Sequence, residues 1–96
     1  MTNKERLHYA KLASLGCIVC RYMGYGFSPC EIHHIRHGAG AGQKSNYTEA
    51  IPLCANHHRL GGYGVAIHAG RAGFKANVGL DEVGLLDLTK SLMEDV

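Results

Sequence analysis

Cysteine and histidine residues occur in this chain of 96 residues at spacings that are typical of metal ligands. Cys17 and Cys20 are separated by two residues, and the same spacing separates Cys54 from His57. Two half-sites of this kind can together supply the four ligands of a tetrahedral zinc ion. The pattern therefore predicts a closed site in which a structural Zn²⁺ is bound by Cys17, Cys20, Cys54 and His57.

Two alternative interpretations of the cysteines stay open. Cys30 can replace Cys54 or His57 in the ligand set, and Cys17 with Cys20 can form the redox pair of a thiol redox protein. A redox pair is expected between a strand and a helix, whereas this motif follows a predicted helix. The redox interpretation also leaves Cys54 and His57 without a role.

Four further histidines, in or beside a basic part of the chain, are not needed for the zinc site: His33, His34, His58 and His68. Imidazole is both a metal ligand and a proton acceptor near neutral pH. We therefore predict a second, open metal site with a general base beside it, as in a catalytic centre. Adjacent side chains of a strand point to opposite faces, so His33 and His34 can face one site only at a strand end or a bulge. The two remaining histidines are placed on the surface, His8 and His37.

Short elements are expected to position these ligands, in an α+β fold that forms one domain over residues 1–96. Thr2 and Glu5 form a capping box, which predicts a helix over about residues 3–14 that ends at Gly16. A final helix is predicted from Asp81 to about Met93, where leucines recur at helical spacing. The elements expected between these flanking helices are a knuckle at 17–20, a loop at 22–29, strands at 31–35 and 50–53 around a glycine-rich loop, a helical turn at 54–60 and a weak helix at 69–77.

The composition restricts both the size of the core and the kind of partner. The chain has 13 glycines and no tryptophan, so a small core is expected, and a bound metal ion would add stability that such a core lacks. The net charge is only +2, but acidic residues concentrate near the C-terminus and leave the middle of the chain basic. The basic middle permits a nucleic-acid partner, for which the candidate contacts are Arg36, Lys44, Arg59 and Arg71.

The sequence also indicates a compartment. No apolar run is long enough to span a membrane, and no secretory signal is visible at the N-terminus. We therefore expect a cytoplasmic location without a membrane partner. Thiols stay reduced there and are available as metal ligands.

This arrangement resembles the HNH, or ββα-metal, nucleases. Their pattern is a pair of knuckle cysteines, an acidic residue just before a histidine pair, a loop, and an apolar strand that ends in Leu-Cys-x-x-Cys-His or a variant. The corresponding elements here are Cys17 with Cys20, Glu31 before His33-His34, the glycine-rich loop, and Ile51-Pro52-Leu53-Cys54-Ala55-Asn56-His57-His58. Within the HNH nucleases, the stretch from Gly61 through His68 and Phe74 to Leu86 is similar to the tail of the Ref-type RecA-dependent nucleases of phages, and more loosely to short prophage nucleases of the YbcO type. The resemblance covers about residues 15–90.

The resemblance implies a metal-dependent endonuclease that hydrolyses DNA phosphodiester bonds and has a zinc-stapled ββα-metal fold. It implies that His34 is the general base that activates water, and that Glu31 orients a ligand imidazole. It also implies a catalytic divalent cation, Mg²⁺, Mn²⁺ or Zn²⁺, bound by His33, His58 and His68. The partners it implies are DNA and RecA or another recombination protein.

Two positions differ from the HNH pattern. Glu49 stands where the HNH nucleases usually have an asparagine, nine residues before the later histidine. Gly62 stands where many members have their last histidine, and His68 follows His58 by ten residues. Glu49 favours an alternative function, a non-catalytic zinc-stapled module that binds nucleic acid or protein. The histidines beyond the zinc site favour the enzyme.

Overall fold

Helices, short helical turns and a two-stranded sheet make up the computed structural model, which describes residues 2–35 and 47–94. In chain order the elements are α1 (Asn3–Leu15), α2 (Ile18–Tyr22), β1 (Glu31–His34), β2 (Ala50–Leu53), the π-helical turn η1 (Asn56–Leu60), the 3-10 turn η2 (Ile67–Ala69), α3 (Arg71–Val78) and α4 (Glu82–Glu94). The predicted α+β class is confirmed. The predicted glycine-rich loop lies outside the described residues, and so do three residues given a place or role above, namely Arg36, His37 and Lys44.

The two long helices begin at the capping residues that the sequence indicates. Thr2 Oγ1 accepts a hydrogen bond from the N–H of Glu5 at 3.2 Å, and α1 then continues to Leu15. Asp81 Oδ1 accepts a hydrogen bond from the N–H of Gly84 at 2.9 Å, and α4 follows directly. These local bonds satisfy N–H groups of the first turn that have no partner inside the helix, which explains why both starts were predictable.

The sheet is a single antiparallel pair in the described residues, with His33 opposite Ile51 and His34 opposite Ala50. Every residue of β2 is buried, whereas β1 is only partly covered. Beyond the end of β1, the N–H of Ile35 donates to the carbonyl of Glu49 at 2.9 Å. The pairing is regular, so adjacent side chains of β1 point to opposite faces and reach different neighbours.

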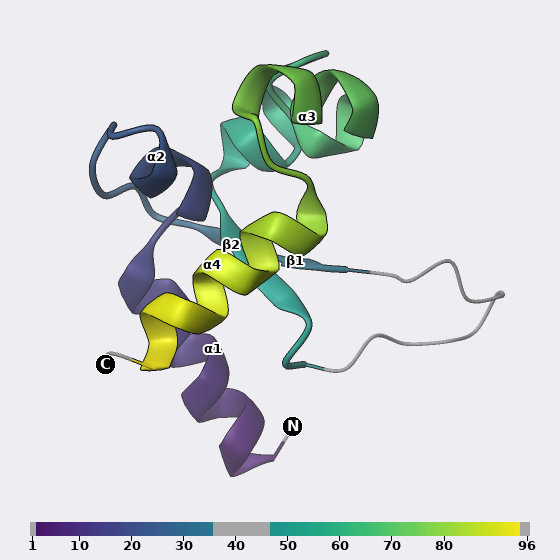
Figure 1. Ribbon diagram of the computed structural model, residues 1–96. Coiled ribbons are helices and arrows are strands. Elements are labelled where there is room, and N and C mark those ends of the chain that lie inside the picture. Colours follow the sequence, from purple (N-terminus) through teal and green to yellow (C-terminus); the bar gives the residue numbers. More distant parts are fainter. Residues whose placement is uncertain (1, 36–46, 95–96) are drawn as a thin grey trace, which may run out of the picture.

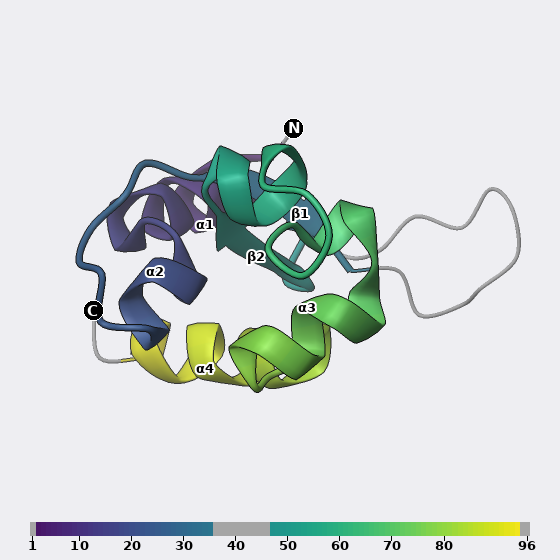
Figure 2. The same ribbon diagram turned by 90° about the horizontal axis from the view of Figure 1, so that it is seen from above.

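Helices cover the sheet on both faces. α4 crosses in front of β2 in Figure 1, and both α1 and α2 also contact β2. Figure 2, seen from above, shows the sheet between α4 on one side and η1 with α1 on the other. The largest fully buried side chains come from these elements and from α3, and they include Leu12, Ile18, Ile51, Phe74 and Leu85. This core brings the start of α2 to the end of β2, and the start of α4 to β1.

The structure differs from the predicted elements in the short helical segments. α2 forms where only a knuckle is predicted, and η2 precedes α3, which begins two residues later than the predicted helix. Segments of three to five residues carry too little periodicity to be recognised from sequence. His8, predicted on the surface, is half-buried instead, with its ring edge-on to Tyr47. In residues 2–35 and 47–94, no helix has the length and hydropathy needed to cross a membrane.

Candidate metal centres

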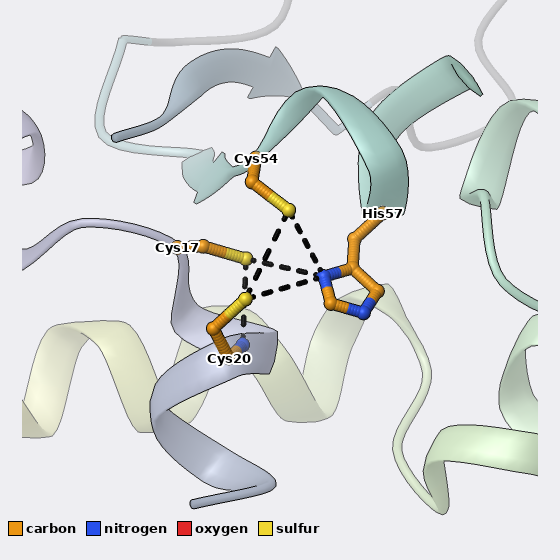
Figure 3. Close-up of side chains that lie close together, drawn as sticks. All are labelled: Cys17, Cys20, Cys54 and His57. Atoms are coloured by element: carbon orange, nitrogen blue, oxygen red, sulfur yellow. Dashed lines mark hydrogen bonds between the residues drawn. The ribbon is translucent and has the colours of Figure 1, made fainter. Parts of the chain in front are cut away.

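The start of α2 and the end of β2 bring three cysteines and a histidine together (Figure 3). Cys17 caps α2, and its Sγ accepts a hydrogen bond from the N–H of Cys20 at 3.4 Å. Cys54 follows β2, and His57 lies three residues later in η1. Gly16, with φ of 71°, makes the turn from α1 into the knuckle, where a Cβ would lie 2.7 Å from a phenylalanine ring. In each half-site the two ligands are three residues apart and lie on one helical turn, Cys17 with Cys20 at α2 and Cys54 with His57 at η1.

The distances within this Cys₃His cluster (Cys17, Cys20, Cys54 and His57) match a tetrahedral ligand set. His57 Nδ1 lies 3.5, 3.6 and 3.1 Å from the Sγ atoms of Cys17, Cys20 and Cys54, respectively. The Sγ atoms of Cys20 and Cys54 are 3.9 Å apart. Zinc with ordinary bond lengths and tetrahedral angles separates sulfur from nitrogen by about 3.6 Å and two sulfurs by about 3.8 Å. The cluster could therefore hold a metal ion such as zinc.

Burial gives the Cys₃His cluster a second property of a metal site. Burial raises the pKa of the Cys17 thiol to about 12 and lowers the pKa of His57. The imidazole is therefore neutral near neutral pH and offers a lone pair, whereas a thiolate in this setting requires a nearby positive charge. A cation between the sulfurs would supply that charge.

Cys30 lies outside the Cys₃His cluster. Its Sγ donates to the carbonyl of Leu12 in α1 at 3.7 Å. All four cysteines are free thiols, so no disulfide removes a ligand. The sequence leaves open whether Cys30 replaces Cys54 or His57 as a ligand. The structure brings Cys54 and His57 together with Cys17 and Cys20, without Cys30.

Three of the remaining histidines converge at a second place, from β1, η1 and η2. The ligand atoms of this His cluster (His33, His58 and His68) lie within 4.8 Å of one another. Their ring centroids are 4.5, 5.1 and 5.3 Å apart. His33 and His58 are half-buried, whereas His68 is exposed and lines, with His33 and Arg71, a cavity of about 250 Å³. The cluster could hold a metal ion and still leave a side open to a ligand.

Two carboxylates hold rings of the His cluster. Glu31 Oε1 lies 2.8 Å from Nδ1 of His58, and Glu82 Oε2 lies 2.6 Å from Nε2 of His33. A ligand histidine commonly donates its second ring nitrogen to a carboxylate, which fixes the tautomer and the ring orientation. Sequence reasoning missed Glu82, which lies 49 residues from His33 in the first turn of α4. An acidic residue there is ordinarily explained by the helix dipole, so no sequence signal pointed to the site.

The same two glutamates pair with two of the arginines predicted to contact nucleic acid. Arg59 donates from Nε and Nη2 to the two carboxylate oxygens of Glu31, at 3.0 and 2.8 Å. Arg71 Nε lies 3.1 Å from Glu82 Oε1. The hydrogen bonds from Arg59 hold the pKa of Glu31 at about 2, so Glu31 is ionised at neutral pH. Burial lowers the pKa of His33, against the opposing effect of Glu82.

His34 does not join the His cluster. Its side chain points to the other face of β1, where the hydroxyl of Tyr9 on α1 lies 3.0 Å from Nε2. The His34 ring is exposed. Tyr9 was also missed by sequence reasoning, because an aromatic residue on a helix is ordinarily assigned to the core. The two adjacent histidines of β1 therefore lie on opposite sides of one strand, with one ring in the cluster and the other open to solvent.

Comparison with known proteins identifies a family. The family model described as "Recombination enhancement, RecA-dependent nuclease" matches residues 1–83, a range that contains both clusters and Glu82. No curated protein and no solved structure matches the chain. The name of the family points to a nuclease, a hydrolase of nucleic acids, that acts in recombination. Since the match covers 83 of 96 residues, the chain belongs to the family of RecA-dependent nucleases.

Proposed function

We propose that residues 1–96 form one HNH-like domain that hydrolyses DNA phosphodiester bonds with the help of a divalent cation. The observation that carries this proposal is the presence of two different clusters. The Cys₃His cluster is rich in sulfur and has two buried and two half-buried members, which suits a structural Zn²⁺. The His cluster has imidazole nitrogens as donors, an exposed member and an adjoining cavity, which suits an ion that must also contact substrate.

The chemistry requires an activated water, stabilisation of the developing negative charge and help for the leaving oxygen. A divalent cation, Mg²⁺, Mn²⁺ or Zn²⁺, bound by His33, His58 and His68 would stabilise that charge and the leaving oxygen. We assign the role of general base to His34, the last residue of β1, whose exposed ring lies on the other face of the strand from the His cluster. For this ring to take a proton from the attacking water, the phosphate would have to lie across the end of β1. Glu31 holds His58 through Nδ1 and so orients that ring.

DNA would be bound through its phosphates. The candidate contacts are Arg36, Lys44, Arg59 and Arg71. Arg71 is best supported, since it lines the cavity beside the His cluster. We further propose that the protein works with RecA or another recombination protein, as the family name suggests. We also propose that it acts in the cytoplasm, where thiols stay reduced.

A non-catalytic module that binds nucleic acid or protein is the second candidate function. Glu49 favours it, because this residue replaces the asparagine that is usual in HNH nucleases. In the structure the backbone of Glu49 still ties the strands together, since its carbonyl accepts the N–H of Ile35. The pairing of the strands thus extends to Ile35 and Glu49 without the asparagine.

Plasmid nicking with added Mg²⁺, Mn²⁺ or Zn²⁺, measured with and without RecA, distinguishes the two functions. His34→Ala should keep the fold, the structural metal and DNA binding, yet lose nicking by about 10²- to 10⁴-fold. His33→Ala should instead weaken the binding of the catalytic ion, so excess metal should partly restore nicking by this variant. His8→Ala removes a histidine outside both clusters and is the matched control. Full nicking by His34→Ala would eliminate the assigned mechanism, and absence of nicking by the wild type with every ion would favour the binding module.

A further inference from the structure

Glu82 connects two side chains that come from different elements. Its Oε2 lies 2.6 Å from Nε2 of His33 on β1, and its Oε1 lies 3.1 Å from Nε of Arg71 on α3. The side chains of His33 and Glu82 are each 11% exposed, whereas that of Arg71 is 68% exposed. One carboxylate oxygen therefore makes a sheltered contact with a candidate metal ligand, and the other holds an arginine that faces solvent.

The start of α4 fixes this carboxylate in place. Asp81 caps the helix through the N–H of Gly84, and Leu85 and Thr89 on the same helix are buried in the core. The first turn of a helix also favours a negative side chain, because its free N–H groups carry partial positive charge. Glu82 thus projects from a rigid element, so its carboxylate can determine where the rings and guanidinium beside it lie.

The two glutamates of the site contact different ring nitrogens. An ionised carboxylate only accepts hydrogen bonds, so the nitrogen that it contacts carries the proton and the lone pair is on the other nitrogen. Glu31 contacts Nδ1 of His58, which leaves Nε2 of that ring with the lone pair. Glu82 contacts Nε2 of His33, which leaves Nδ1 with the lone pair. Each of these rings therefore has one nitrogen committed to a carboxylate and one free for a cation.

We propose that Glu82 is a positioning residue, which holds His33 in the orientation of a metal ligand and places Arg71 beside the adjoining cavity. This inference rests on the proposed function, because it concerns the same site. Glu82 is not part of the set of ligand atoms that lie within 4.8 Å of one another, so it acts through His33 and not as a further ligand. Arg71 adds a positive charge to a cavity lined by His33 and His68, which suits a phosphate group.

Titration of Co²⁺ into protein whose Cys₃His cluster is filled with Zn²⁺ tests this role, with the visible absorption of Co²⁺ as the readout. Glu82→Ala should weaken Co²⁺ binding by about 10- to 100-fold. Glu82→Gln should stay within about threefold of the wild type, because its amide oxygen can accept the same hydrogen bond from His33. Asp87→Ala, which removes an exposed carboxylate from the same helix, is the control and should bind Co²⁺ as the wild type does.

Arg71→Ala separates the two contacts of Glu82. It should leave Co²⁺ affinity unchanged and weaken the binding of a short DNA duplex. Wild-type Co²⁺ affinity in Glu82→Ala would overturn the inference, and so would equal weakening in Glu82→Gln and Glu82→Ala, since the carboxylate would then act as a ligand or by charge alone. A Glu82→Ala protein that loses its structural zinc or its fold would assign Glu82 to stability and overturn the inference too.

The experiment also separates this inference from the proposed function. If the wild type binds no Co²⁺ at the His cluster and does not nick DNA, the proposed function fails. If the wild type does both and Glu82→Ala matches it, only the role of Glu82 fails.

Discussion

Removal of one sulfur from the Cys₃His cluster gives the sharpest test of the proposed structural zinc. Cys54→Ser is the best perturbation, because Cys54 is half-buried and a serine hydroxyl there can remain hydrated. Cys30→Ser is the matched control: Cys30 is also half-buried, and its sulfur lies near a backbone carbonyl outside the cluster. Both variants change one sulfur to oxygen, and only one of them should affect the metal.

The expected magnitude follows from what the cluster connects. Cys17 and Cys20 lie at the start of α2, and their partners follow β2, 34 to 40 residues later in the chain. Structural zinc contributes about 10–16 kcal/mol in small zinc domains, whereas a whole domain is stable by only about 5–15 kcal/mol. We therefore expect the free energy of unfolding to fall by more than about 3 kcal/mol in Cys54→Ser, which should be largely unfolded. In Cys30→Ser it should fall by less than about 1 kcal/mol.

Urea unfolding followed by circular dichroism, together with zinc content after treatment with a weak chelator, measures both quantities. The wild type and Cys30→Ser should each retain about one zinc per chain. A Cys54→Ser protein that retains zinc and unfolds at the same urea concentration as Cys30→Ser would refute the assignment. Loss of zinc from Cys30→Ser would show that Cys30 is a ligand.

Three further predictions concern binding, pH and packing. DNA affinity should be insensitive to sequence and should fall with salt, with a slope of log K against log salt of about −2 to −4 for two to four phosphate contacts. Burial, and then the charge of Lys11, lower the pKa of His8, so His8 binds a proton more readily in the unfolded chain than in the folded one. The wild type should therefore lose stability relative to His8→Phe as the pH falls from about 7 to about 5, measured by urea unfolding at each pH. Gly16 and Gly24 both have positive φ, of 71° and 81°, but a Cβ on Gly16 would lie 2.7 Å from the ring of Phe27 and one on Gly24 would meet nothing within 4 Å. Gly16→Ala should thus lower the free energy of unfolding by at least about 2 kcal/mol, and Gly24→Ala by about 1 kcal/mol, as measured by thermal or urea unfolding.

Each of these predictions has a contrary result. DNA affinity that stays flat between low and physiological salt would argue for a protein partner instead. Parallel stability curves for wild type and His8→Phe would show that His8 has the same proton affinity in both states. Equal costs for the two alanine substitutions would show that the contact at Gly16 relaxes without strain.

The two clusters share η1, so a metal ion in the Cys₃His cluster would help to position a residue of the His cluster. His57 belongs to the Cys₃His cluster and His58 to the His cluster, although they are adjacent. Consecutive side chains on an α-helix point about 100° apart, so a single turn can serve two sites. In η1 the N–H of Gly61 donates to the carbonyl of Asn56 at 2.9 Å, a wider π-type bond of the kind that often marks functional sites. Zinc bound by His57 would hold this turn, and with it the position of His58.

Local chemistry is what the sequence by itself determined. The spacing of Cys17 to Cys20 and of Cys54 to His57 is meaningful because ligands three residues apart meet on one helical turn. The starts of α1 and α4 are predictable from the sequence because a capping side chain accepts a hydrogen bond from an N–H three residues away. These features depend on neighbours along the chain, so they are readable without a fold.

Only the tertiary structure decided how the histidines and carboxylates are shared. Adjacent side chains of β1 point to opposite faces, so the fold places His33 in the His cluster and His34 beside Tyr9. It also brought Glu82 onto His33 across 49 residues of sequence, and left Cys30 outside the Cys₃His cluster. These contacts depend on how α4 and α1 pack on the two faces of the sheet. That packing is set by the shape of the whole core, and no local periodicity or spacing encodes it.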